Sequence, residues 1–170
     1  QGLSECSGVL TGFGGHRQAA GVKVDPDRVE DLRQAFHLAV VNQIGPQPLD
    51  PKLRLEAVLG LKAVDVNLVK EIDLLQPFGP GNPQPIFRSK PLKVRKHQIF
   101  GKNHVSLEVR DEQAGVTMLG KAWRQADRLT TDLTGQSVLL AFTPRFNHYN
   151  GMTSIDLQVR DLCLASEFQA

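Results

Sequence analysis

The chain has 170 residues, of which 41% are hydrophobic and 22% are charged, which is typical of a folded soluble protein with a buried core. No apolar run reaches the length of a membrane span, and the start does not resemble a signal segment. Because the sequence begins with Gln1 and residues 1–8 show no pattern of their own, we expect a piece of a longer protein.

The two cysteines, Cys6 and Cys163, lie far apart and match neither a metal-binding nor a redox spacing. We interpret them as free thiols, which are usual in a reducing compartment. The sequence therefore favours a cytoplasmic protein without a membrane partner.

Glycine is concentrated at the start of the chain, before a short strand predicted over residues 22–24. Asp25 and Pro26 then predict the start of a helix, because Asp is a preferred N-cap residue and Pro fits the first helical position. Apolar residues at helical spacing extend this helix to about residue 43, and Gly45 ends it.

The next part predicts a strand over residues 53–58 and a second helix that begins after Asp65. Residues 76–85 hold four prolines and two glycines, which exclude a helix or a central strand and indicate a rigid junction. We expect Phe78 to anchor this loop on the following domain; contact of Asn82 with a nucleic acid is the alternative.

The remainder alternates as an all-β segment, with a short helix predicted over residues 122–133 between the third and fourth strands. The Asn150-Gly151 pair indicates a tight hairpin between the last two strands. Five strands with a helix after the third predict an OB barrel; an SH3-like barrel or a small open sheet is the alternative. The expected strands cover residues 86–99, 105–111, 116–121, 137–145 and 153–160.

Basic residues are concentrated between residues 87 and 110, which contain seven Lys and Arg residues and a single acidic residue, Glu108. Such a stripe is typical of a surface that binds phosphate backbones, although a solvated strand face or a charged sheet edge has the same pattern. The candidate basic contacts are Arg88, Lys90, Lys93, Arg95, Lys96, Lys121 and Arg145, with Arg160 on the last strand.

Aromatic side chains near the turns are candidate platforms on which bases stack. Tyr149 sits at the hairpin tip, which favours contact over burial, whereas we interpret Trp123 and Phe142 as core residues. The stacking candidates are Phe100, Trp123, Phe146, His148 and Tyr149.

A second candidate site is the string Gly14-Gly15-His16-Arg17. Glycines allow the backbone close to a ligand and their amides can bind phosphate oxygens, while His16 and Arg17 supply a donor and a fixed positive charge. A tight turn capped by the histidine is the structural alternative.

Longer strings carry a resemblance to a known family. Residues 13–21 resemble the end of the DHHA1 domain of DHH-family phosphoesterases, and residues 77–87 resemble the junction before the OB domain of bacterial RecJ single-strand-specific exonucleases. Residues 147–151 and 157–162 are similar to the last hairpin of that domain. Because the three signatures keep the family's order, the chain is identified as a member of the RecJ family.

The resemblance implies an α+β chain in which a short α/β remnant of a DHHA1 domain precedes a five-stranded OB-fold β-barrel. The C-terminal part of DHHA1 would cover residues 1–52 and a connector residues 53–85. Residues 86–170 would form the domain that binds single-stranded DNA.

The family degrades single-stranded DNA from the 5′ end in DNA repair and recombination, using Mn²⁺ or Mg²⁺ held by Asp and His ligands of the DHH domain. No Asp-His-His occurs in this sequence, and its five histidines are scattered, so we expect the chain to bind no metal and to be inactive alone. The residue that matches the family's histidine near the scissile phosphate is His16.

Two other functions remain open. A nuclease-inactive relative that serves as a replication scaffold would have the same C-terminal part, and an upstream Asp-His-His would distinguish the two. A DHH-family enzyme for short oligonucleotides is disfavoured by the additional barrel. The expected partners are single-stranded DNA and a single-strand-binding protein or a helicase. The oligomeric state is open, and a monomer is favoured.

Overall fold

The computed structural model describes residues 1–16, 19–47 and 51–168. The chain divides into two compact units, Gln1–Lys52 and Leu53–Ala170. Within the described residues, no helix combines the length and the apolar character needed to cross a membrane.

The N-terminal unit joins a β-hairpin to a long helix. The Gly-Gly-His string does not form a loop: it lies in a strand, with Gly15 opposite Ala20 and His16 opposite Ala19. The helix ends before Gly45, whose φ of 89° suits glycine, as expected. The elements are α1 (Gly2–Glu5), β1 (Gly12–His16), β2 (Ala19–Lys23), the 3₁₀ turn η1 (Pro26–Arg28) and α2 (Val29–Ile44).

The expectations for this unit were only partly correct. A short helix occupies residues 2–5, where no element was expected, and β2 begins three residues before the predicted strand. Asp25 does precede the helical segment with Pro26 at its first position, but its side chain makes no capping hydrogen bond.

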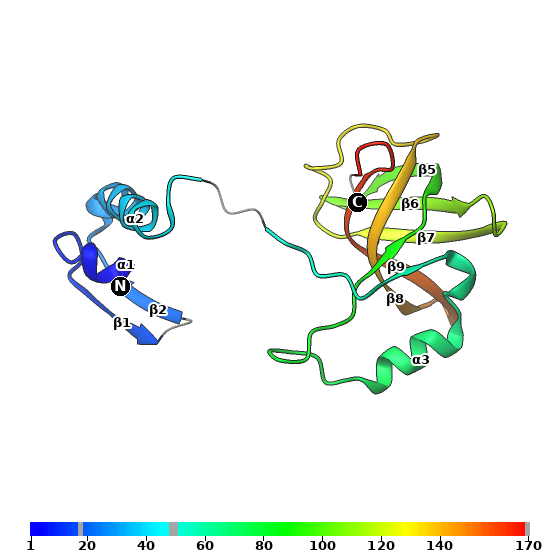
Figure 1. Cartoon of the computed structure of the whole chain (residues 1–170), viewed down its shortest axis with the longest axis horizontal. Helices are drawn as coiled ribbons and strands as arrows, with labels where there is room; N and C mark the ends of the chain where they lie inside the picture. Colours follow the sequence, from blue (N-terminus) through cyan, green and yellow to red (C-terminus); the bar gives the residue numbers. More distant parts are fainter. Residues whose placement is uncertain (17–18, 48–50, 169–170) are drawn as a thin grey trace. The chain divides into compact units, whose positions relative to one another are not determined.

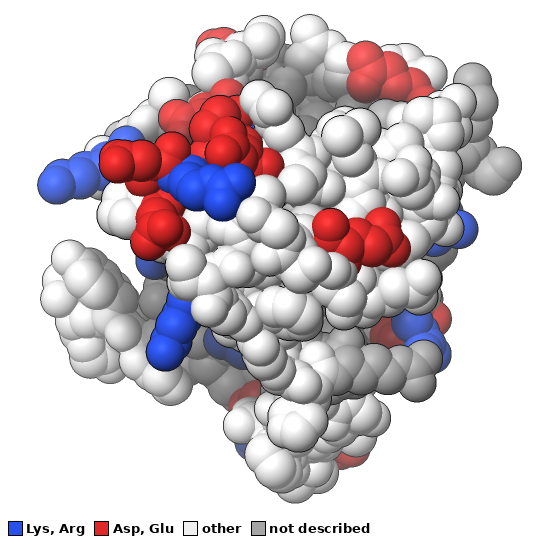
Figure 2. All heavy atoms as spheres, turned by 90° about the vertical axis from the view of Figure 1, so that its left-hand side faces the viewer, with Lys and Arg blue, Asp and Glu red and all other residues white. Residues whose placement is uncertain are grey.

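The N-terminal unit buries little apolar surface. Among its described hydrophobic residues only Cys6 and Ala39 are buried. Figure 2, which faces this unit, shows charged side chains in small clusters within a wide uncharged surface. Its exposed large apolar side chains are Phe13, Val22, Val29, Phe36, Leu38 and Ile44.

The second unit begins with β3 (Ala57–Leu59), the 3₁₀ turn η2 (Leu61–Ala63) and α3 (Val66–Leu74). The predicted cap is confirmed, because the Asp65 carboxylate accepts a hydrogen bond from the Leu68 amide at 2.8 Å. Figure 1 shows α3 against one end of the strands. Leu61 and Ile72 belong to the buried core, so the segment expected as a connector also stabilises the unit.

The proline-rich loop after α3 is held by its own hydrogen bonds. The Asn82 side-chain amide donates to the carbonyl oxygens of Leu75 and Pro77 at 2.8 and 2.9 Å, so it serves the loop's structure. Phe78 packs against the core, as expected. At the far end of the loop, the Thr143 hydroxyl donates to the Pro85 carbonyl at 2.7 Å and fixes the loop to a strand.

The strands form one mixed sheet in the order β3-β4-β8-β5-β6-β7-β9, and β9 also pairs with β8, so the pairing of five strands returns on itself. The strand predicted over residues 86–99 is interrupted near Pro91, which cannot donate a ladder hydrogen bond. The strands are β4 (Phe87–Ser89), β5 (Leu92–Phe100), β6 (His104–Asp111), β7 (Val116–Ala122), β8 (Ser137–Tyr149) and β9 (Met152–Leu164).

The helix predicted over residues 122–133 is wrong, because this segment forms turns and irregular backbone. Side chains from β5 and from the β5–β6 turn bind its amides: His97 Nδ1 accepts from Leu133 N, and Asn103 Oδ1 accepts from Ala126 N. Arg124 has a φ of 57°, which no α-helix contains. Long-range hydrogen bonds therefore replace those of a helix.

The core of the unit lies inside the ring of paired strands. Phe142 is fully buried, as expected, and packs with the Phe87 ring at a centroid distance of 6.4 Å. Beyond the ring, Phe146–Tyr149 of β8 pair only with Met152–Ile155 of β9. This two-stranded extension is called the hairpin arm below.

Candidate nucleic-acid interface

The outer face of β7, β9 and β8 carries polar side chains in register. Lys121 of β7 lies opposite Gln158 of β9, and Asp156 of β9 lies opposite Arg145 of β8. Alternation along these strands sends the intervening side chains into the core, where Ala122 and Leu157 are buried. The three strands therefore present a continuous polar surface.

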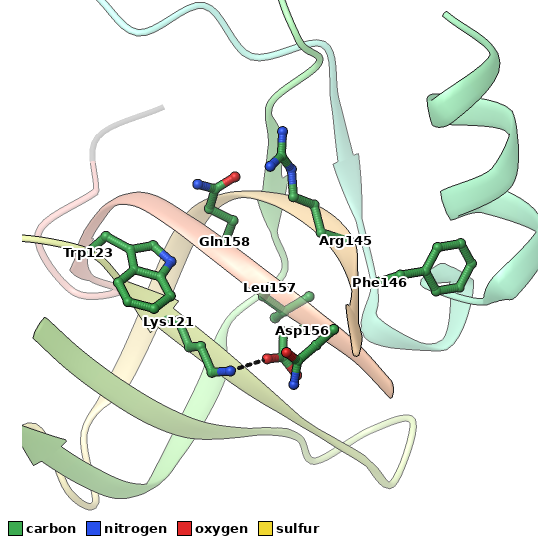
Figure 3. A pocket seen from close by; sticks show the side chains of 8 residues that line it. Lys121, Trp123, Arg145, Phe146, Asp156, Leu157 and Gln158 are labelled. Atoms are coloured by element: carbon green, nitrogen blue, oxygen red, sulfur yellow. Dashed lines mark ion pairs between the residues drawn. The ribbon is translucent and has the colours of Figure 1, made fainter. Parts of the chain in front are cut away.

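A pocket of about 170 Å³ opens on this surface (Figure 3). Lys121 and Asp156 form its floor through an ion pair of 2.6 Å, while the Arg145 side chain extends away from the strands. The pocket combines cationic groups, amides and aromatic rings, which are the groups that bind phosphates and bases. Its lining residues are Lys121, Trp123, Arg145, Phe146, Asn147, Asp156, Leu157 and Gln158.

Trp123 is not a core residue, which corrects the expectation from the sequence. Its side chain is 47% exposed at the mouth of the pocket. The ring is held by edge contacts with His104 and Phe100, at centroid distances of 4.8 and 5.6 Å. His104 is itself oriented by the Arg124 amide, which donates to its Nδ1 at 3.0 Å. An exposed but oriented indole can stack on a base at little cost in entropy.

The hairpin arm adds further rings beside the pocket. Phe146 and His148 stack at 6.2 Å with an interplanar angle of 29°. Tyr149 is 69% exposed next to the turn formed by Asn150 and Gly151, as expected for a hairpin tip. The aromatic candidates thus lie in two groups, one around Trp123 and one on the arm.

The basic stripe of β5 is not one free surface. Arg95 forms an ion pair with Glu112 at 2.7 Å, and Lys96 lies opposite Glu108. Arg110 also reaches Glu112, at 3.8 Å. Glu112 follows the stripe in the sequence, and the antiparallel pairing of β6 with β5 brings it to Arg95.

The remaining basic candidates of the stripe lie away from the pocket. Arg88 of β4 stacks over the Phe168 ring at 4.6 Å and lines a separate, apolar pocket. Lys90 lies beside Gly60, and Lys93 lies opposite Ser137 at the β5–β8 contact. Of the predicted basic contacts, the structure brings Lys121 and Arg145 to one pocket and places Arg160 beside Arg145.

Sequence reasoning missed Gln84, a residue of the proline-rich loop. Its Oε1 accepts hydrogen bonds from Arg145 Nη2 and Arg160 Nη2, each at 3.0 Å. Burial and the neighbouring Arg145 lower the pKa of the Arg160 guanidinium. No sequence signal indicates this contact, because Gln84 lies 61 and 76 positions from the two arginines.

The Gly-Gly-His string of the N-terminal unit lies in β1, which pairs closely with β2. A Cβ on Gly15 would clash with the backbone at Ala19 O and Ala20 Cα, so no other residue fits there. Gly14, Gly15 and His16 line one side of a cavity of about 540 Å³ whose other walls include Phe36. Arg17, predicted to contact phosphate, lies outside the described residues.

No group of three or more His, Cys, Asp or Glu side chains is arranged to hold a metal ion among the residues that the structure describes. The exposed His16 belongs to no such group among these residues. The described residues do not fit a metal centre.

Five strands whose pairing closes on itself, with basic and aromatic groups on the outer face, match the pattern of OB domains. The family model described as the RecJ OB domain matches residues 55–161. The chain belongs to this family.

Curated relatives extend the similarity over nearly the whole chain. The single-stranded-DNA-specific exonuclease RecJ of Bacillus subtilis is 26% identical over 99% of this chain and 21% of its own length. RecJ of Haemophilus influenzae is 25% identical over 92% of this chain and 27% of its own length. The chain thus spans about a quarter of the length of these relatives.

A solved structure supports the fold. The crystal structure of RecJ from Thermus thermophilus in complex with Mn²⁺ superposes with a TM-score of 0.65 at 27% identity, covering 95% of this chain and 23% of that one. The structure of the same protein in complex with Mg²⁺ gives a TM-score of 0.66 at 23% identity, covering 95% and 24%.

Proposed function

We propose that this chain is the C-terminal, DNA-holding part of a single-stranded-DNA-specific 5′-to-3′ exonuclease of DNA repair and recombination. The observation that carries the proposal is the outer face on which Trp123, Lys121 and Arg145 surround one pocket. The names of the RecJ relatives support single-stranded DNA as the substrate.

In this proposal, the closed ring of five strands is an OB barrel within residues 86–170. Residues 1–52 are the C-terminal part of a DHHA1 domain, and residues 53–85 connect the two. The division of the chain after Lys52 and the resemblance of residues 13–21 support this arrangement. The exposed apolar side chains of the first unit support its being part of a larger domain.

The outer face would hold a single strand by two physical effects. Arg145 neutralises a backbone phosphate and releases counterions, which makes binding dependent on salt, whereas Lys121 contributes only where a phosphate replaces Asp156 in its ion pair. Trp123 and Tyr149 offer faces on which bases stack, each worth about 1–3 kcal/mol. Stacking requires no particular base, so the surface suits a substrate of any sequence.

The hydrolytic chemistry would lie outside this chain. The whole enzyme would use Mn²⁺ or Mg²⁺, the ions in the Thermus thermophilus RecJ structures, on ligands of a DHH domain. His16, with Gly14, Gly15 and Arg17, would contact the scissile phosphate. The chain alone would therefore bind DNA without cleaving it.

The protein would act in the cytoplasm as a monomer, beside a single-strand-binding protein or a helicase that exposes its substrate. These partners follow from the substrate, because single-stranded DNA in a cell is produced by unwinding and is covered by binding proteins.

A titration of a fluorescent oligothymidylate with the 170-residue chain tests the proposal at about 50 and about 300 mM salt. Binding at low salt that weakens steeply at high salt is expected, with no shortening of the oligonucleotide in the presence of Mn²⁺. No binding at low salt would contradict the proposed function.

A further inference from the structure

Two arginines on neighbouring strands share one neutral acceptor. Arg145 of β8 and Arg160 of β9 each donate from Nη2 to Gln84 Oε1 at 3.0 Å. The two nitrogens therefore lie no more than 6.0 Å apart, although both groups are positively charged. Like charges at this separation repel each other, so the arrangement is unfavourable unless an anion joins it.

The nearby carboxylates do not balance this charge. Asp156 pairs with Lys121 at 2.6 Å, and Asp161 pairs with Arg128 at 2.8 Å. Across the described ranges of the chain, no carboxylate lies within 4.0 Å of the Arg145 or Arg160 guanidinium. The pair therefore keeps its positive charge available to a ligand.

Gln84 is held firmly enough to orient both arginines. The next residue, Pro85, accepts the hydrogen bond of the Thr143 hydroxyl at 2.7 Å, and Thr143 is fully buried in β8. One residue further, the Ile86 carbonyl accepts from the Glu56 amide at 2.8 Å. The backbone around Gln84 is thus fixed on the same strand that carries Arg145.

We propose that Gln84 positions Arg145 and Arg160 as a single site for one backbone phosphate of the bound strand. This inference rests on the proposed function, which it deepens by assigning the ligand group and a positioning residue. Each guanidinium has five N–H donors, and Gln84 occupies one on each. The others can donate to the two non-bridging oxygens of one phosphodiester at about 2.8 Å.

Substitutions of the three residues test the site by affinity and by its dependence on salt. For single strands, neutralising one phosphate contributes about 0.7 to the slope of log K against log salt. Arg145→Gln and Arg160→Gln should each weaken binding, and the double variant should lose little more than either. Lys62→Gln, which removes an exposed charge in η2, is the matched control.

Substitution of Gln84 separates positioning from folding. Gln84→Ala keeps both charges but should weaken binding several-fold, because the arginines lose their orientation. Gln84→Glu should weaken binding more, because the carboxylate pairs with both arginines, while the stability to urea is kept or raised. If Gln84 had a purely structural role, the DNA affinity of its variants would instead fall in proportion to their free energy of unfolding.

The outcomes distinguish this site from the proposed function. The single-phosphate site is overturned if the unmodified chain binds DNA but the arginine variants bind like Lys62→Gln. It is also overturned if the losses of binding free energy in the two single variants add fully in the double variant. In both cases the proposed function stands. Titration with dimethyl phosphate, followed through the Nε–H signals of Arg145 and Arg160, tests the site even without DNA binding. Joint shifts of both signals are expected, and unchanged signals would refute the site.

Discussion

Replacement of Trp123 by alanine probes the stacking platform most directly. A stacked base is worth about 1–3 kcal/mol, which corresponds to an affinity loss of about 5- to 150-fold. The variant also loses two edge contacts with His104 and Phe100, worth about 0.5–1.5 kcal/mol each. Because the indole is 47% exposed, a loss of stability well below that of a core substitution is expected.

The assay is fluorescence anisotropy with a labelled oligothymidylate, accompanied by urea unfolding of each variant. Trp123→Phe retains an aromatic face and should recover a large part of the affinity. Leu74→Ala removes an apolar side chain of similar or greater exposure from the end of α3 and should bind like the unmodified chain. If Trp123→Ala stays folded and binds within twofold of the unmodified chain, the stacking role is refuted.

Three other substitutions or reactions test separate parts of the structure. In the proposed full-length exonuclease, His16→Ala should reduce turnover far more than DNA affinity; equal losses in kinetic and binding assays would restrict His16 to binding. Phe142→Ala should lower the free energy of unfolding by about 3–5 kcal/mol in urea titrations, because this ring is fully buried, and a much smaller loss would contradict its place in the core. Burial, together with the negative charges of Glu167 and Asp161, raises the pKa of the Cys163 thiol. Alkylation of this thiol should therefore be slow at neutral pH and faster at alkaline pH. Rapid alkylation at neutral pH would contradict the buried, negatively charged surroundings of Cys163.

The sequence pattern predicted the elements whose structure depends on local chemistry. The Asp65 cap and the Asn150-Gly151 turn occur where expected, because each depends on neighbouring residues alone. The helix over residues 122–133 failed because the competing partners, His97 and Asn103, come from another part of the sheet. Propensity cannot anticipate such contacts.

The candidate site was predictable in its residue types but not in its grouping. Lys121 and Arg145 follow from charge on strands, whereas the neutralisation of Arg95 by Glu112 depends on how a turn folds back. The exposure of Trp123 was misjudged because large aromatic side chains are usually buried. No sequence pattern distinguishes Gln84, because its role depends on the contact of the proline-rich loop with Arg145 of β8 and Arg160 of β9.

The hairpin arm has a mechanical consequence. Its backbone hydrogen bonds run only between Phe146–Tyr149 and Met152–Ile155, so twisting the arm breaks no bond of the five-strand ring. Two-stranded ribbons carry a larger twist than wider sheets. Under the proposed function, the rings of Phe146, His148 and Tyr149 would adjust to the bases of a bound strand without disturbing the pairing of the five strands that carry the phosphate contacts.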